Sequence, residues 1–203
     1  MSATFTQPMP AIAAPPPAEP TPRRWTREEY YQMGDLGLFH GQRVELIEGE
    51  IMVLSPQNWP HTSTVDRVGE ALRRVLGTGF WVRMQFPLNL STSDPEPDVS
   101  VVAGRFEDYS DHPTTAVLIV EVSESTLAYD RSRKASLYAR AGIADYWIVN
   151  LVDHQLEVRR DPQPDPSQPY GHSYASVTTL VPPAVVNPLA APKVSLAVAD
   201  LLP

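Results

Sequence analysis

The apolar residues of this chain recur at helical spacing in some segments and form short continuous or alternating runs in others. Helical spacing predicts an amphipathic helix over about 63–76 and another over about 130–141, which ends before a glycine. Thr26 and Glu29 have the spacing of a capping box, which predicts an earlier helix over about 26–34. The chain therefore contains helices separated by segments of a different pattern.

Short β-rich runs predict the strands of a sheet. The first two, over 43–47 and 50–54, pair as a hairpin if Glu48-Gly49 is a two-residue turn. One face of this hairpin is expected to be core and the other is mixed; their residues are Val44, Leu46, Ile51 and Val53, and Glu45, Ile47, Glu50 and Met52. Further strands are predicted in FWVRMQFPLNL, PDVSVVA, VLIVEV, DYWIVNL, HQLEVRR and SYASVTTLV, with a proline-rich loop, DPQPDPSQPYGH, before the last. Because VLIVEV is apolar on both faces, it is typical of a central strand in a covered sheet.

The N-terminal stretch differs from the rest of the chain. Residues 1–24 are dense in proline and alanine and have no period that could bury a face, so a disordered tail is predicted there. Residues 25–203 show no internal repeat and are long enough to bury a sizeable core. We therefore expect one domain over 25–203.

Composition narrows the classes of function. The chain has 203 residues, no cysteine and a formal net charge of −8. The lack of cysteine excludes disulfides and thiolate metal sites, and a cytoplasmic location is expected. No apolar run has the length of a transmembrane helix, and no secretory signal is recognisable, so no membrane partner is expected. The acidic balance counts against a general nucleic-acid binder, which usually carries a basic face, unless a local basic rim or a bound cation meets the phosphate.

Two carboxylates stand out against this background. Glu121 interrupts the apolar run VLIVEV, and a buried ionised carboxylate is costly unless it is paired or bound to a metal. Asp98 follows a proline at the start of a β-branched strand, a position that also suits a turn aspartate. On neighbouring strands the two could converge and bind Mg²⁺, which prefers a few carboxylates with waters and phosphate oxygens. A structural ion pair is the alternative for Glu121.

Lys134 lies in the helix that follows the Glu121 strand. It shares a helix face with Leu137, Tyr138 and Ala141, at i+3, i+4 and i+7. Because Leu137 and Ala141 are expected to face the sheet, Lys134 is expected beside the inward face, near the start of the helix. A solvated surface lysine is the alternative, and Tyr138 fits packing better than chemistry.

The segments PDVSVV, VEVSEST and YDRSRKASLYARAGIADYWIVNL resemble the PD-(D/E)XK, or restriction-endonuclease-like, nuclease superfamily. More closely, the chain resembles the Uma-type restriction endonucleases, which RVELIEGEIMVLSP and SLAVADLLP also fit. The similarity spans about 25–203, and its specific part is the block 117–151. It implies an α/β (α+β) fold with a restriction-endonuclease-like core, namely a central mixed β-sheet flanked by helices, with additional β-hairpins.

The resemblance also implies roles for particular residues. Asp98 would be the aspartate of the PD motif and Glu121 the second acid, and both would hold Mg²⁺ or Mn²⁺ with the backbone carbonyl of Val122. The superfamily lysine normally falls two residues after that acid, where this chain has Ser123. In this family the lysine moves to the following helix, which implies a catalytic role for Lys134.

Further residues match the family less specifically. Glu45 corresponds to a glutamate of the early hairpin and would be a further acid at the metal, unless that face is exposed to solvent. His61 corresponds to a histidine before the second helix and would be an accessory residue, as Tyr138 would, with polar surface and packing as the alternatives. Arg131 and Arg133 would bind the substrate. They belong to a basic strip that would favour DNA over a small phosphoester, together with Arg67, Arg73 and Arg74.

Together these features predict a Mg²⁺-dependent endonuclease that hydrolyses DNA phosphodiester bonds. Cleavage of both strands would need two sites, which suggests a homodimer. One alternative is a non-catalytic protein of the nuclease fold that associates with DNA or regulates, which the acidic balance and Ser123 favour. Another is a metal-dependent hydrolase of small phosphoesters. The chain has no GxSxG, P-loop or HExxH motif.

Overall fold

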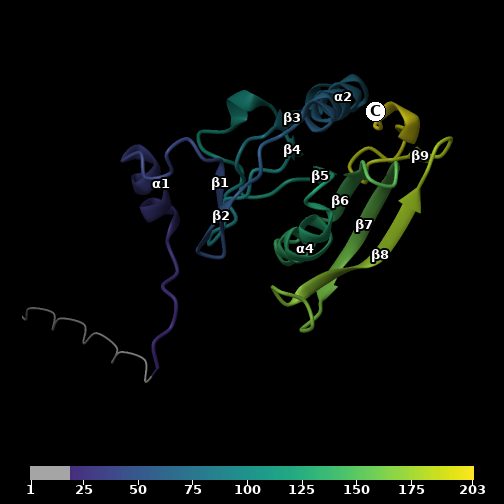
Figure 1. Cartoon of the computed structure of the whole chain (residues 1–203). Helices are drawn as coiled ribbons and strands as arrows, with labels where there is room; N and C mark the ends of the chain where they lie inside the picture. The colour runs from purple at the N-terminus through teal and green to yellow at the C-terminus, as the bar shows by residue number, and fades with distance from the viewer. Residues whose placement is uncertain (1–18) are drawn as a thin grey trace, which may run out of the picture.

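The computed structural model describes residues 19–203, so most of the predicted tail lies outside the described residues. The centre of the fold is a six-stranded sheet in the order β3-β4-β5-β6-β7-β8 (Figure 1). Neighbouring strands are antiparallel except β5 and β6, which are parallel. The strands are β3 (Phe80–Met84), β4 (Val99–Ala103), β5 (Leu118–Ser123), β6 (Asp145–Asn150), β7 (Gln155–Pro164) and β8 (His172–Leu180). This mixed sheet between helices confirms the predicted fold class.

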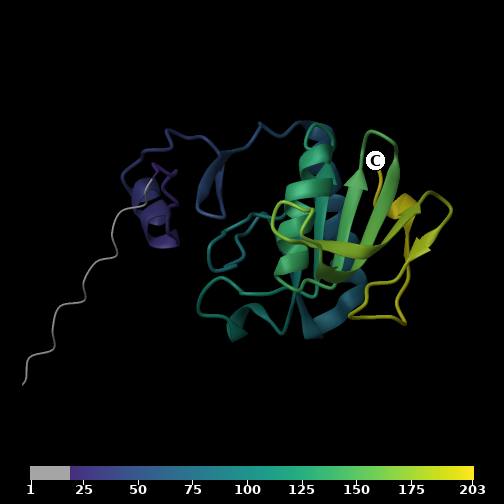
Figure 2. The same ribbon diagram turned by 90° about the horizontal axis from the view of Figure 1, so that it is seen from below.

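Helices cover both faces of the sheet, because side chains along each strand point alternately to either side. Leu72 and Val122 meet in the core cluster on the α2 face, and Leu137 and Ile119 meet in the cluster on the α4 face. Figures 1 and 2 show α4 packed on the side of the sheet opposite α2. The helices are α1 (Arg27–Asp35), α2 (Trp59–Leu76), α3 (Leu127–Tyr129) and α4 (Ala135–Arg140), and a π-helical turn over Asp130–Lys134 joins the last two. Strand β5 is thus central and covered, as its sequence predicts.

Helix α1 and a hairpin of β1 (Val44–Ile47) and β2 (Glu50–Val53) form a smaller unit beside the sheet (Figure 2). The predicted capping box is present at the start of α1. The hairpin turn is Glu48-Gly49, and both residues have positive φ, at 51° and 73°, as a two-residue turn of this kind requires. Ile47 packs in the cluster on the α4 face, so the mixed face of the hairpin is turned toward the domain.

Several boundaries differ from the prediction. Helix α2 begins at Trp59, earlier than expected, because Asn58 caps it and a proline fits its first turn. Val53 was expected in the core and is 61% exposed, although its strand partner Val44 is buried. The proline-rich loop is shorter than expected, because β7 and β8 remain paired as far as Pro164 and His172.

The chain ends in a small appendage on the α2 face. Strands β9 (Val185–Val186) and β10 (Leu196–Ala197) pair there, and Leu201 and Leu202 belong to the main core cluster. Within residues 19–203, no helix combines the length and the apolar character needed to cross a bilayer.

Candidate active site

Asp98 and Glu121 face each other across the strand pair β4–β5. Val99 is paired with Val120, so the residue before β4 lies opposite Glu121. The Asp98 amide donates to Glu121 Oε2 at 3.1 Å, and the Val122 amide donates to Asp98 Oδ2 at 2.8 Å. Both side chains are buried, at 7% and 5% exposure. The two carboxylates therefore lie together at the end of the central strands, as the sequence led us to expect.

Lys134 reaches the same place from the π-helical turn. Its Nζ lies 2.8 Å from both carboxylate oxygens of Glu45 and 3.4 Å from Glu121 Oε1. Burial lowers the pKa of Lys134, but the carboxylates of Glu121 and Glu45 outweigh burial and raise it above its usual value. The side chain is therefore a buried ammonium between two carboxylates.

Glu45 comes to the site from β1, on the hairpin face that turns toward the domain. Its side chain is 1% exposed, and its Oε1 accepts the Glu96 amide at 2.8 Å. Its Oε2 is close to Lys134 but forms no hydrogen bond of good geometry within the described residues. Glu45 is thus enclosed by protein, and the solvent-exposed alternative does not apply to it.

The charge on Glu121 is poorly compensated. Burial raises the pKa of Glu121 to about 8; Lys134 opposes the rise, and the Asp98 carboxylate adds to it. Tyr138 donates its hydroxyl to Glu121 Oε1 at 2.7 Å, so this tyrosine contacts the site as well as packing in the core. Further positive charge beside Glu121 would therefore stabilise its ionised form.

Asp98 Oδ1 is the oxygen that does not accept the Val122 amide, and three side chains lie around it. His61 Nε2 is 3.0 Å away, and the amides of Gln57 and Gln85 are each at 3.5 Å. His61 is placed by the cap of α2, where its amide donates to the Asn58 side chain. The two glutamines had no signal in the sequence, because each lies in an irregular segment whose direction only the fold determines.

Ser123, at the position where the resemblance places a lysine, forms a hydrogen bond with the turn that follows β5. Its hydroxyl donates to Asp130 Oδ2 at 2.6 Å, and Thr126 donates to the same oxygen. Asp130 is buried at the start of the π-helical turn, and burial raises its pKa against these two hydrogen bonds. Ser123 therefore fixes the turn that delivers Lys134. Sequence reasoning missed Asp130, whose only signal is a short acidic residue at the start of the predicted helix, in YDRSRK.

Arg131 and Arg133 are already engaged by carboxylates. Arg131 Nε donates to Glu157 at 3.0 Å, and Arg133 lies 3.3 Å from Glu50. Neither lines the cavity beside Asp98 and Glu121. Their predicted contact with substrate would require these ion pairs to open.

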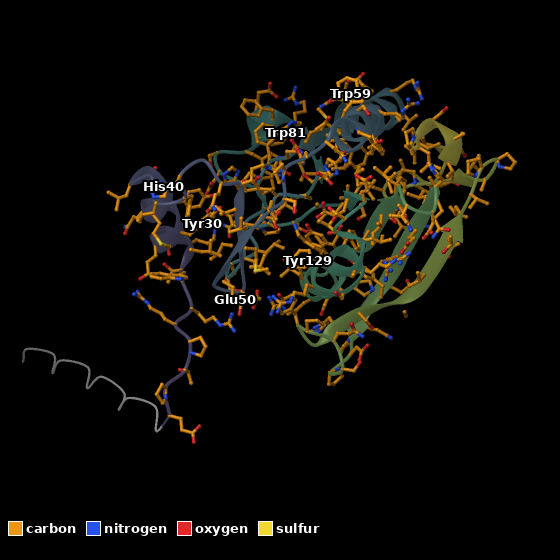
Figure 3. The ribbon with its side chains drawn as sticks, in the orientation of Figure 1. Tyr30, His40, Glu50, Trp59, Trp81 and Tyr129 are labelled. Carbon is orange, nitrogen blue, oxygen red and sulfur yellow. The ribbon has the colours of Figure 1, made fainter. Side chains whose placement is uncertain are left out.

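A cavity with a volume of about 100 Å³ opens beside these groups, between the start of α2, the hairpin and the turn after β5. Asp98, Glu121 and Lys134 line it, as does Tyr129, whose hydroxyl is buried without a hydrogen-bond partner within the described residues. Figure 3 shows Tyr129 beside α4 and Glu50 at the tip of the hairpin. The cavity is thus lined by charged and polar side chains.

The donor set suits a divalent cation only in part. Within residues 19–203, no three His, Asp or Glu side chains are arranged to hold a metal ion as they stand. Mg²⁺ needs only one or two protein carboxylates, since waters and phosphate oxygens complete its octahedron. Asp98 and Glu121 meet that requirement, and the incomplete compensation of Glu121 favours a cation there. The residues therefore fit Mg²⁺ or Mn²⁺ with few protein ligands.

Fold and site together define a nuclease-like protein with a buried carboxylate–lysine cluster at the end of its sheet. The sequence profile of the Uma2 family, described as "Putative restriction endonuclease", matches residues 27–199, and the chain belongs to this family. No curated protein matches the chain. Among solved structures, it is similar to "a putative nuclease belonging to DUF820" from Anabaena variabilis, with a TM-score of 0.62 and 16% identity, over 87% of this chain and 96% of that chain. The structural likeness supports the fold.

Proposed function

We propose that the protein is a metal-dependent endonuclease that hydrolyses DNA phosphodiester bonds at this site. The observation that carries the proposal is the pair of buried carboxylates, Asp98 and Glu121, linked through the Asp98 backbone amide, with Lys134 in the same cavity. Membership of a family described as restriction endonucleases supports the substrate class. A purely structural role would not require buried polar atoms that open onto a cavity.

The metal would be held by Asp98, Glu121 and the backbone carbonyl of Val122, with Glu45 completing the site. When bound, it would polarise a phosphoryl oxygen and lower the pKa of a water molecule. In the hydrolysis, the water oxygen bonds to phosphorus, and one ester oxygen leaves and takes up a proton. His61 and Tyr138 orient Asp98 and Glu121 through the hydrogen bonds already described.

Lys134 has an electrostatic role in this scheme. Its raised pKa keeps Nζ protonated, so the side chain donates hydrogen bonds and does not act as a base. An ammonium placed next to Glu121 can orient the attacking water or stabilise charge on the phosphorus oxygens. Glu45 holds this ammonium in place.

One observation favours the non-catalytic alternative. Lys134 is fully engaged between Glu45 and Glu121, and the described residues present no ready cluster of three ligands. A nuclease fold retained for DNA association would tolerate this closed arrangement. Metal binding and cleavage distinguish the two.

The test is a titration of Mn²⁺ into the wild type and Glu121→Gln, followed by a plasmid-nicking assay. The amide keeps the shape and the acceptor for Tyr138 but removes the charge, so metal binding and nicking should both be lost. We expect nicking to fall by at least about 10²-fold, the scale of removing one stabilising group.

Glu107→Gln, at an exposed position outside the cavity, is the matched control and should nick like the wild type. A thermal unfolding curve ensures that Glu121→Gln remains folded. Undiminished nicking by Glu121→Gln would refute the assignment, and no metal binding by the wild type would favour the non-catalytic alternative.

A further inference from the structure

Most basic side chains of this protein are neutralised by its own carboxylates. Of the predicted basic strip, Arg73 pairs with Glu70 and Arg74 with Asp200, in addition to the pairs of Arg131 and Arg133. Within the described part of the chain, the basic residues without such a carboxylate are Arg67, Arg83, Arg105 and Lys193. A duplex is held mainly through its phosphates, so this surface offers little to duplex DNA.

Two exposed aromatic side chains adjoin the groups around Asp98. Trp59, 80% exposed, begins α2 two residues before His61, and Phe86, 51% exposed, directly follows Gln85. His61 and Gln85 both approach Oδ1 of Asp98. Single exposed apolar residues are common on protein surfaces. What distinguishes these two is that each is a neighbour in sequence of a residue at the carboxylate.

Phe86 is part of a larger aromatic pocket. It lies over the guanidinium of Arg83 at 5.6 Å, and Trp81 lies over the same guanidinium at 4.9 Å. The pocket has a volume of about 410 Å³, and Phe106 and Tyr109 also line it. Trp81 and Tyr109 pack against the cluster on the α4 face of the sheet. Figure 3 shows Trp59 at the start of α2.

Arg83 is unusual because it is buried without a counter-charge. It is 2% exposed, its Nε has no hydrogen-bond partner within the described residues, and burial lowers its pKa. One amino group donates to the Pro87 carbonyl at 2.9 Å, and the other is 3.5 Å from the Ser100 hydroxyl. Ser100 follows Asp98 by two residues, a separation of about 7 Å along an extended chain.

If the site acts on nucleic acid as proposed above, the paired arginines and the exposed aromatic rings favour a single strand over a duplex as the substrate. We propose that the substrate is a single-stranded or locally unpaired segment, whose bases stack on Trp59 and Phe86 beside the scissile phosphate. Stacking on aromatic rings holds single strands without reading their sequence. It also needs fewer phosphate contacts than a duplex does, which fits the paired arginines.

The test measures binding in a Glu121→Gln background, so that the strand is not cut during the measurement. A fluorescein-labelled oligodeoxynucleotide of mixed sequence is used alone and annealed to its complement, and anisotropy gives both dissociation constants. The single strand should bind more tightly than the duplex. Trp59→Ala and Phe86→Ala should each weaken single-strand binding by between about 5-fold and about 150-fold, the range for one stacked base.

Trp59→Phe separates stacking from a structural role, because it keeps an aromatic ring and should retain most of the affinity. Val177→Ala, an exposed apolar residue on β8, is the matched control and should bind like the background protein. Equal affinity for both forms, or no effect of the two alanine variants, would overturn the inference. Wild-type nicking of duplex plasmid in that case would leave the proposed function intact, whereas loss of all binding and nicking would remove both.

Discussion

At the scale of single residues, the site is a group of buried charges that depend on one another. Lys134 is the positive charge among Glu45, Asp98 and Glu121, and it contacts the first and third of these. Removing one partner of a buried ion pair leaves the other charge without compensation. The lysine therefore contributes to the stability of the domain as well as to the proposed chemistry.

Lys134→Met should reduce the free energy of unfolding by about 3–5 kcal/mol, because Glu45 would remain buried without its counter-charge. Urea denaturation at neutral pH measures the change. The double variant Glu45→Met/Lys134→Met should recover much of the loss, since replacing both charges by apolar groups removes the uncompensated carboxylate. A single variant as stable as the wild type would show that the ion pair does not stabilise the fold.

Residue identity made part of this site predictable. Glu121 breaks an apolar run where burial is otherwise expected, and that conflict is visible in the sequence. Asp98 and Lys134 were singled out by their places at a strand start and beside the inward helix face, and by the resemblance to the nuclease family. Gln57 and Gln85 break no pattern, because polar residues in irregular segments are ordinary. The direction of such side chains depends on backbone conformation, such as the positive φ of 55° at Gln85, which no periodicity encodes.

At the scale of elements, the approach of the hairpin to α4 assembles the site. The hairpin turn is also tied to the segment before α1, since the Gly49 carbonyl accepts the Trp25 amide at 2.9 Å. A Cβ at Gly49 would lie 2.7 Å from Cβ of Arg24 and 3.1 Å from the Trp25 backbone. The turn is therefore closed to any larger residue.

Gly49→Ala should destabilise the protein by about 2–4 kcal/mol, from its positive φ together with the contact with the chain before α1. Gly37→Ala is the matched control, because Gly37 has a φ of 74° and no atom within 4 Å of its Cβ position. The control should cost only about 1–2 kcal/mol, which reflects the backbone alone. Equal losses in thermal unfolding would show that the contact has no effect.

Elements with strong local signals were predictable and their junctions were not. The hairpin turn and the cap of α1 follow from the residues that form them. The start of α2 follows from Asn58 and the proline of its first turn, which the apolar periodicity does not register. The π-helical turn depends on Ser123 and Asp130, which meet only after β5 and the helix have packed together. The sequence also predicted the mixed face of the hairpin, but only the docking against α4 shows that this face is buried.

At the scale of the whole molecule, the net charge of −8 is distributed so that carboxylates accompany most of the arginines. Such a surface exerts little long-range attraction on a polyanion. Binding would then depend on short-range contacts at the site, and it should respond weakly to salt.

The salt dependence of single-strand binding should therefore be shallow. For single strands the slope of log K against log salt concentration is about −0.7 per neutralised phosphate, so one or two contacts give a magnitude below about 1.5. Anisotropy titrations of Glu121→Gln over a range of KCl concentrations measure it. A magnitude near 4, which corresponds to about six phosphates, would indicate a basic groove that this charge distribution does not provide.

Residues of the site come from distant parts of the sequence, and this affects when the site forms during folding. Lys134 and Glu45 lie 89 residues apart in the chain, and the parallel pairing of β5 with β6 requires a crossover before the sheet is continuous. Contacts between residues this far apart in the sequence form late in folding. The chain must lose the entropy of closing a long loop before the contact can stabilise it. A partly synthesised or misfolded chain would carry every one of these residues and no assembled site. The nuclease activity proposed above would therefore require a folded domain, and an unfinished chain would not have it.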